Sequence, residues 1–402
     1  MATADVLKPD FAAQRKHFIF TEDHEQLRES IHRFVVSELQ PHAEEWEENT
    51  FPDWVFERMG ELGFLGLDKP EAYGGQGGDY YTALVLAEEL VHAHCGGLGM
   101  GVAVQTDMAM PPILAFGTEE QKHEWAAPAI AGKKILSIGI SEPDAGSDVS
   151  GIKTRAVKDG DEWVINGSKT FITNGHRCHG IVLVTKTEPD PSPATHPRTT
   201  HDGFTLFIVS MNLPGVIREK KLEKLGTHAS DTALLAFQDV RVPASAVLGQ
   251  VGKGFYHIMW ELQGERLIGA AGSVAGAQHV FDRTLAYAKE RTAFGRPIGR
   301  FQAIRHKFAE MATKIETARQ MVYTTAWRFQ NGEYPVREIT MAKLYSARIA
   351  VEVADECIQI HGGNGYMKEY GIERVWRDLR LNRIGAGTDE IMLDVIGRSY
   401  GL

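Results

Sequence analysis

The sequence predicts an α+β protein in which a central β-sheet domain lies between two helical domains. In the first part of the chain, apolar residues such as Leu27 and Ile31 follow helical spacing. Short runs rich in β-branched and aromatic residues then alternate with turn residues, and long helical runs follow. We therefore expect three units around a shared interior: an N-terminal α-helical domain (1–130), a central β-sheet domain (131–250) and a C-terminal four-helix-bundle domain (251–402).

Periodicity, together with Gly and Pro breaks, locates the individual elements. The expected N-terminal helices cover 22–38, 54–62 and 80–91, and Pro41 ends the first of them. The expected strands lie within 156–165, 180–185, 204–209 and 232–237. The expected C-terminal helices cover about 255–290, 300–331, 336–362 and 388–398.

The bulk composition is that of an ordinary globular protein. The chain has 402 residues, of which 43% are apolar and 24% charged, and its formal net charge is −10. No basic face is evident that would neutralise phosphates, so a nucleic-acid binder is not expected. The three cysteines, Cys95, Cys178 and Cys357, are far apart and odd in number, which favours a reducing compartment over a disulfide framework.

The sequence also argues against targeting, membrane and metal segments. Residues 1–20 carry Asp5 and Asp10 and lack an apolar core, so no signal peptide is expected. No run approaches the roughly 18 apolar residues of a membrane span. The run 176–179 (His-Arg-Cys-His) has no second ligand pair at regular spacing, so no metal site is expected. We expect a cytoplasmic location.

Two polar loops are the most informative part of the sequence. They read ISEPDAGSD at 140–148 and NGSKTFITNG at 166–175, and a strand-rich run separates them. They could line one edge of a sheet and hold a flat polar group there. A third segment, RLNRIGAGTDE at 380–390, has the same Gly-rich polar character.

Glu265 lies on an otherwise apolar helical face. Its neighbours at i−3, i+3 and i+4 are Leu262, Ile268 and Gly269, and the one other carboxylate on that face is Glu261. Loss of water raises a carboxyl pKa and produces a base that is active near neutral pH. The alternative is a structural glutamate that pairs with a lysine or arginine on another helix.

Taken together, these segments resemble the acyl-CoA dehydrogenases over nearly the whole chain. Many members carry the catalytic base as Glu in a late Tyr-Glu-Gly-Thr motif, but here 385–388 reads Gly-Ala-Gly-Thr, so Ala386 takes the position. A subset that includes isovaleryl- and long-chain acyl-CoA dehydrogenases keeps its base on an earlier long helix, in a Glu-Arg pair that matches Glu265 and Arg266. The resemblance therefore assigns Glu265 as the base and the backbone N–H of Ala386 as an oxyanion donor.

The resemblance also implies FAD as the cofactor. The first loop and the segment after it supply expected contacts at Ile138, Ile140, Ser141, Gly146, Ser147, Phe171, Ile172 and Thr173. A stretch expected to reach the flavin of a neighbouring subunit supplies Arg291, Phe294, Phe301 and Gln302. Gly-rich and helix-opening segments supply Gln359, Ile360, His361, Gly362, Gly363, Thr388, Asp389 and Glu390.

The implied substrate is an acyl-CoA thioester, and the implied contacts are Ser147, Gln263, Arg266 and Gly387. We expect a branched-chain or medium-to-long acyl group, because the residues around the base are small, and we expect helices around 80–110 to set the length limit. Leu98, Met100, Met108 and Met110 are candidates for the pocket, with core packing as the alternative. The implied partners are an electron-transferring flavoprotein and further copies of the chain in a homotetramer.

Three alternatives share this scaffold. A flavin oxidase or monooxygenase would react with oxygen, and a dehydrogenase of carrier-protein-bound acyl groups would differ in its entrance. A non-catalytic flavin-binding protein would explain Ala386, although Glu265 argues against it.

Overall fold

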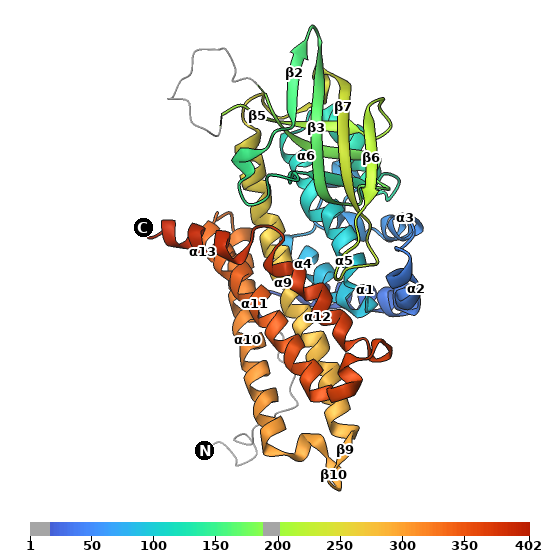
Figure 1. The fold of residues 1–402 in the computed structure, drawn as a ribbon, viewed down its shortest axis with the longest axis vertical. Coiled ribbons are helices and arrows are strands. Elements are labelled where there is room, and N and C mark those ends of the chain that lie inside the picture. Colours follow the sequence, from blue (N-terminus) through green and yellow to red (C-terminus); the bar gives the residue numbers. More distant parts are fainter. Residues whose placement is uncertain (1–16, 188–201) are drawn as a thin grey trace.

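A computed structural model describes residues 17–187 and 202–402. The signal-peptide prediction rests largely on residues 1–16, which lie outside the described residues. Figure 1 shows an elongated molecule with the β-sheet at one end, a bundle of long helices at the other, and the N-terminal helices packed beside them.

The N-terminal domain is helical, as expected. Its α-helices are α1 (Glu22–Phe34), α2 (Ala43–Glu48), α3 (Trp54–Glu61), α4 (Tyr80–Glu89), α5 (Gly96–Ala103), α6 (Met110–Phe116), α7 (Glu119–Gln121) and α8 (Ala127–Ile130). The Asp79 carboxylate caps α4 by accepting hydrogen bonds from the backbone N–H groups of Tyr81 and Thr82. A π-helical segment, Val104–Ala109, joins α5 to α6.

The central domain is a mixed sheet. Its strands are β1 (Leu136–Gly139), β2 (Arg155–Asp159), β3 (Glu162–Thr173), β4 (Gly180–Lys186), β5 (Phe204–Ser210), β6 (Val216–Lys221), β7 (Thr232–Pro243) and β8 (Val247–Leu248). The order is β6-β7-β3-β2-β4-β5-β8, with β1 parallel to β4. The pairing of β3 with β7 shifts register twice, between Ile165 and Gly167 and between Lys169 and Ile172. The second shift lies inside the predicted flavin segment.

The C-terminal domain is built on one long helix. α9 (Gly254–Glu290) runs unbroken from beneath the sheet to the far end of the molecule, where a small β-hairpin of β9 (Thr292–Ala293) and β10 (Arg296–Pro297) follows. The remaining helices are α10 (Gln302–Gln330), α11 (Val336–His361), α12 (Ile372–Arg380) and α13 (Asp389–Arg398).

Each domain contributes to a core that another domain also fills. Residues of α1, α3 and α5 pack with the sheet residues Ile165 and Phe237, and α4 packs with α9, α10 and α11 through Leu84. A third cluster joins α6 to the start of α9 through Ile113 and Ile258. The predicted fold class, α+β with three units around a shared interior, is therefore confirmed. None of the helices within residues 17–187 and 202–402 has the length and apolar character of a membrane span.

Candidate functional site

A cavity of about 180 Å³ lies where the N-terminal helices meet the bundle. Native packing leaves few voids larger than a water molecule, and an apolar cavity of roughly 150 Å³ already accepts an organic ligand, so this space has the size of a binding site. Its walls come from α4, α5, the π-helical segment, α9 and α12, and include Leu86, Leu90, Gly99, Met100, Asp107, Met108, Glu265, Gly272, His279 and Asp378. Helices around 80–110, which we expect to set the limit on acyl-chain length, supply part of this lining.

The four pocket candidates separate into two groups. Met100 and Met108 line the cavity. Leu98 and Met110 are fully buried in hydrophobic core clusters instead, which was the alternative reading.

One face of α9 forms a long wall of the cavity. Its lining residues are Glu265, Ile268, Gly269, Gly272, Gly276 and His279, which recur at helical spacing. A Cβ added at Gly269 or Gly272 would meet nothing within 4 Å. Gly269 and Gly272 therefore leave space for a ligand along the helix, whereas Gly276 packs against Leu379.

Glu265 stands at one end of this wall. Burial raises the pKa of its carboxyl above the ordinary value, while the positive charges of Arg266 and Lys343 and the neighbouring Glu261 act in the opposite direction. A carboxylate with a raised pKa beside an apolar cavity has the properties of a general base.

The Gly-Ala-Gly-Thr segment lies next to Arg266. Arg266 is buried, and its Nε donates to the Ala386 carbonyl at 3.0 Å. Lys343 Nζ donates to the Gly387 carbonyl, and burial lowers the pKa of Lys343 to about 8. Ala386 itself has a φ of 56°, a left-handed conformation that costs a non-glycine residue roughly 1–2 kcal/mol. Arg266 and Lys343 therefore hold the peptide groups on both sides of position 387. These contacts stabilise the left-handed conformation of Ala386, which a non-glycine residue does not favour by itself.

The other predicted substrate contacts are placed differently. Gln263 is buried, and its amide Nε2 donates back to the Met259 carbonyl on the same helix at 2.8 Å. Its Oε1 has no hydrogen-bond partner among the described residues. Ser147 is exposed on the 140–148 loop.

The register shift in β3 explains the exposure of the predicted flavin segment. A β-bulge bends the strand and redirects side chains. Here Phe171 has a φ of 61° and is 71% exposed, between the buried Ile172 and Thr170. The backbone N–H of Thr170 donates to the Ser141 carbonyl at 2.9 Å, and Ser137 Oγ donates to the Thr173 carbonyl at 2.6 Å. The two predicted flavin loops therefore lie side by side.

An ion pair buried between the loops holds them together. Lys169 Nζ donates to Glu142 Oε1 at 2.8 Å and to the Ile140 carbonyl at 2.9 Å, and the two side chains are 0% and 5% exposed. Glu142 also accepts from the backbone N–H groups of Lys153 and Thr154. Burial lowers the pKa of Lys169 to about 8, although Glu142 opposes the change. Both residues belong to the quoted motifs, but sequence reasoning gave them no function.

These residues fit a bound flavin. An exposed aromatic ring at Phe171 offers a stacking surface, and Ser141 and Thr173 lie half-buried beside it. A Cβ at Gly146 would meet nothing within 4 Å, so the loop leaves room for a close approach. Ile138 and Ile140 are half-buried in the segment that leads into the loop.

A second group of predicted cofactor residues lies at the opposite end of the molecule. Arg291, Phe294, Phe301 and Gln302 surround the β9–β10 hairpin, at the end of the bundle farthest from the sheet (Figure 1). Phe294 is 95% exposed. The 359–363 segment lies at this end too, because His361 stacks on Tyr287 with ring centroids 4.2 Å apart. Gln359, Gly362 and Gly363 are exposed, and Ile360 is buried.

A hydroxyl cap and two ion pairs stabilise the N-terminus of α13. Thr388 Oγ1 caps the helix by accepting from the Ile391 N–H. The buried Asp389 carboxylate accepts from Arg348 at 3.0 Å and from Arg383 at 2.7 Å, so it positions two cations near this helix N-terminus. Glu390 is exposed.

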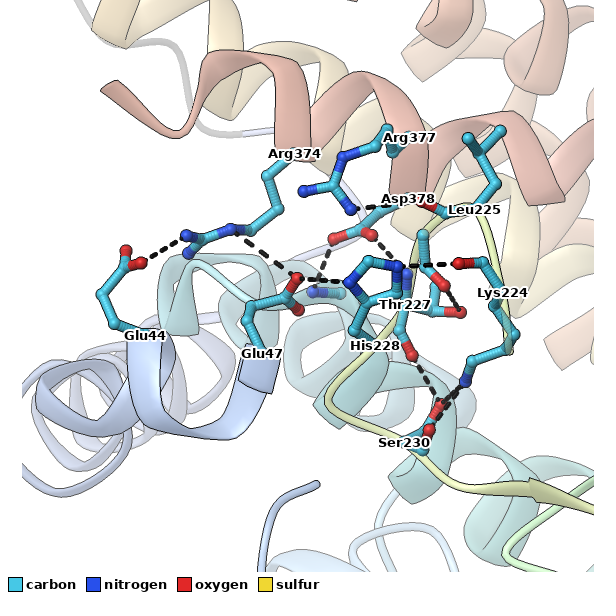
Figure 2. A network of polar contacts seen from close by, with 12 residues as sticks. Glu44, Glu47, Lys224, Leu225, Thr227, His228, Ser230, Arg374, Arg377 and Asp378 are labelled. Carbon is cyan, nitrogen blue, oxygen red and sulfur yellow. Dashed lines mark hydrogen bonds and ion pairs between the residues drawn. The ribbon is translucent and has the colours of Figure 1, made fainter. Parts of the chain in front are cut away.

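A polar network closes the cavity at the end away from Glu265. Figure 2 shows that it joins α2, the segment 222–231 and α12. Asp378, which lines the cavity, accepts from the backbone N–H groups of Gly96 and Thr227, at 3.0 Å and 2.5 Å. Glu47 lies behind it, 3.8 Å from Arg374 Nε and 3.7 Å from His228 Nδ1. Of this network, Gly96, Thr227 and Asp378 line the cavity, so the packing of α12 against α5 and the 222–231 segment limits the cavity here.

The network makes stability depend on pH. Burial and the nearby Asp378 raise the pKa of Glu47 to about 7, against the opposing charges of Arg374 and Arg377. Between the ordinary carboxyl pKa and about pH 7 the folded state binds a proton that the unfolded state has lost, so stability falls as pH rises through this window. Glu47→Gln removes this titration. The difference between Tm at about pH 8 and Tm at about pH 5 is therefore expected to be more positive in the variant than in wild type.

Differential scanning calorimetry at the two pH values measures this effect. Glu48→Gln, an exposed position on the same helix, is the control and should leave the pH dependence unchanged. An identical pH dependence of Tm in wild type and Glu47→Gln would contradict the assignment.

Comparisons with known proteins agree along the whole chain. Family models described as acyl-CoA dehydrogenase N-terminal, middle and C-terminal domains match residues 21–133, 137–240 and 252–401. A probable acyl-CoA dehydrogenase of Bacillus subtilis (strain 168) is 40% identical over 95% of this chain and 99% of its own. The mitochondrial long-chain specific acyl-CoA dehydrogenase of Sus scrofa is 39% identical over 94% of this chain and 87% of its own.

A solved structure gives the same result for the fold. The crystal structure of an acyl-CoA dehydrogenase from Geobacillus kaustophilus superimposes with a TM-score of 0.92 at 41% identity, covering 96% of this chain and 100% of that one.

Proposed function

Because the chain belongs to the acyl-CoA dehydrogenase family, whose members are FAD-dependent oxidoreductases, we propose that it oxidises a long-chain acyl-CoA to the trans-2-enoyl-CoA with Glu265 as the base. The observation that carries the proposal is the pairing of two positions. The late motif holds Ala386 where a glutamate would stand, and Glu265 lines the cavity on the neighbouring helix.

The residues of this site have complementary tasks. The Glu265 carboxylate removes a proton from Cα of the thioester, and its raised pKa makes it basic enough near neutral pH. The Ala386 N–H stabilises the charge that develops on the thioester oxygen, an interaction that contributes roughly 3–4 kcal/mol for one donor. Bound flavin supplies the acceptor for the hydride that leaves Cβ. Phe171, Ser141 and Thr173 would hold its ring, and the Glu142–Lys169 pair orients their two loops.

The length of the cavity supports a long acyl chain. Fourteen positions separate Glu265 from His279 on α9, which corresponds to about 21 Å at about 1.5 Å per residue. An extended polypeptide spans about 3.6 Å per residue, which is three backbone bonds, or about 1.2 Å per bond. An extended acyl chain has similar bond geometry and advances by about the same distance per bond. In length, the wall therefore matches an extended acyl chain of more than ten carbons.

The distal residues support a homotetramer. Arg291, Phe294 and the 359–363 segment are remote from the flavin loops of their own chain, and the 95% exposure of Phe294 is unusual for an aromatic ring. A second copy that brings this end to the flavin loops would use both groups of residues. By family resemblance the electron acceptor is an electron-transferring flavoprotein.

Anaerobic titration of the purified protein with acyl-CoAs from butyryl to palmitoyl, and with isovaleryl-CoA, tests the proposal through the flavin absorbance. Bleaching by long straight chains at the lowest concentrations is the expected result. Preference for isovaleryl-CoA would replace the long-chain assignment by a branched one. If no thioester reduces the flavin, the activity is rejected in favour of carrier-protein substrates or a non-catalytic flavoprotein. If the reduced flavin reoxidises rapidly once oxygen is admitted, an oxidase is favoured.

A substitution in the cavity wall tests the chain-length argument. Gly272 lies seven positions after Glu265, about 10 Å along the helix, beyond the reach of a butyryl group. Gly272→Leu would place a side chain in the space that a long acyl chain is proposed to occupy. Crowding of this kind costs about 1–3 kcal/mol when the chain binds. We expect the ratio of kcat/KM for palmitoyl-CoA to that for butyryl-CoA to fall by roughly tenfold or more. Gly272→Ala should give a smaller decrease, and an unchanged ratio in Gly272→Leu would place the acyl chain elsewhere.

A further inference from the structure

A second carboxyl group on α9 lies beside the base. Glu261 is four positions before Glu265, which places the two side chains on one face of the helix with Cβ atoms about 5–6 Å apart. The Glu261 residue is only 2% exposed. Among the described residues, no N–H or hydroxyl group donates a hydrogen bond to either of its carboxyl oxygens. An ionised carboxylate in this position would cost several kcal/mol.

The charges around the pair do not offset that cost. On α9 itself, Arg266 acts on both carboxyls, but its Nε is bonded to the Ala386 carbonyl. Lys343 of α11 acts on Glu265 and is bonded to the Gly387 carbonyl. From the π-helical segment, the carboxyl of Asp107 adds a further negative group near Glu261. The hydroxyls of Tyr80 and Tyr334 donate to carbonyls of α9.

We propose that Glu261 is a neutral carboxylic acid in the resting protein and that it directs its proton to the Glu265 carboxylate, so that the two groups hold one proton between them. The inference deepens the proposed function, on which it rests. Burial and the negative charge of Glu265 raise the pKa of Glu261 well above its ordinary value, in agreement with the geometry. Two such groups titrate as a pair.

The shared proton has a consequence for the reaction. During turnover the Cα–H bond breaks, its proton forms a bond to a Glu265 oxygen, and its electron pair becomes the new π bond as the Cβ hydride leaves to oxidised flavin. The pair then holds two protons and is neutral, and it returns one to solvent when the product leaves. Before that step, the hydrogen bond from Glu261 keeps Glu265 ionised at a pH where an isolated carboxyl in an apolar site would be protonated. Glu261 is therefore a positioning residue that sets the working pH of the base.

Infrared spectroscopy tests the proton directly and needs no substrate. At neutral pH the wild-type minus Glu261→Gln difference spectrum is expected to contain the carbonyl absorbance of a buried protonated carboxyl, and the wild-type minus Glu265→Gln difference spectrum is expected to lack it; other buried acids such as Glu47 cancel in both. Absence of this band from the wild-type minus Glu261→Gln difference spectrum would overturn the proposal. This result stands even if no acyl-CoA reduces the flavin, so failure of the inference and failure of the proposed activity are distinguishable.

The pH profile of anaerobic flavin reduction provides the kinetic test. Glu261→Gln keeps a hydrogen-bond donor, so the pH at which the rate falls on the acid side should stay near the wild-type value. Glu261→Leu removes the donor and should move this point upward by about one pH unit, a tenfold change in the proton affinity of Glu265. An unchanged or lowered midpoint in Glu261→Leu would contradict the shared proton. If Glu261→Leu does not fold, the infrared comparison of the glutamine variants decides.

Discussion

Glu265→Gln is expected to slow flavin reduction by acyl-CoA by roughly 10²–10⁴-fold, the contribution of a positioned general base. Glutamine has nearly the same volume and preserves the packing of α9, but its amide cannot accept the Cα proton. Ala386 cannot replace it, because the late motif supplies no side-chain base. Stopped-flow absorbance of the flavin under anaerobic conditions measures the rate of this step.

Binding must be separated from chemistry in this experiment. The variant should retain its flavin and still bind acyl-CoA, since neither the loops nor the walls of the cavity change. Glu310→Gln, the same substitution at an exposed position of α10, is the matched control and should react at the wild-type rate. A rate close to wild type in Glu265→Gln would move the base to another residue.

Lys169→Met is expected to cost about 3–5 kcal/mol of stability, because it leaves the buried Glu142 carboxylate without its partner. The loop at 140–148 would lose its side-chain contacts with β3 and keep only the backbone hydrogen bond between Thr170 and Ser141. Flavin should therefore be lost together with stability, which gives a colourless protein of lower Tm. The flavin-to-protein absorbance ratio and calorimetry measure the two effects.

The same loop provides a matched control. Lys153 and Asp144 form an ion pair 2.9 Å apart, but their side chains are 74% and 73% exposed, and such surface pairs contribute about 0–1 kcal/mol. Lys153→Met should therefore change Tm little and retain flavin. The double variant Glu142→Gln/Lys169→Met removes both charges and should recover part of the loss. Equal effects of Lys153→Met and Lys169→Met would show that burial of the pair is unimportant.

Helical spacing and β-type runs were sufficient to predict the fold class, because amphipathic helices such as α1 and continuously apolar strands such as β4 and β5 are recognisable from their own sequences. The short helix α12 (Ile372–Arg380) was not predicted. Its sequence does carry a helical pattern, because Ile372, Val375, Trp376 and Leu379 recur at helical spacing between charged residues. A register shift such as the one before Phe171 depends on pairing with β7, which local sequence does not specify.

The candidate site likewise contains residues that local sequence identifies and residues that only tertiary contacts bring together. The position of Glu265 on an apolar face is a local pattern, so periodicity could identify it as a candidate. Lys343 and Asp107 reach that region from other elements, and no spacing relates them to Glu265. The pairing of Glu142 with Lys169 depends on a contact between residues far apart in the sequence. Glu261 interrupts the apolar pattern, and its near-complete burial is evident only in the structure.

The unbroken course of α9 constrains how this architecture can change over evolution. Inserting or deleting one residue between Glu265 and His279 would turn every later residue by about 100° around the helix axis and move it by about 1.5 Å. The cavity wall would then face a different neighbour, and the hairpin at the far end would point in another direction. Acyl-chain preference can therefore diverge among descendants of this chain through point substitutions along the wall, whereas changes in the length of α9 would disrupt the base, the wall and the distal hairpin together.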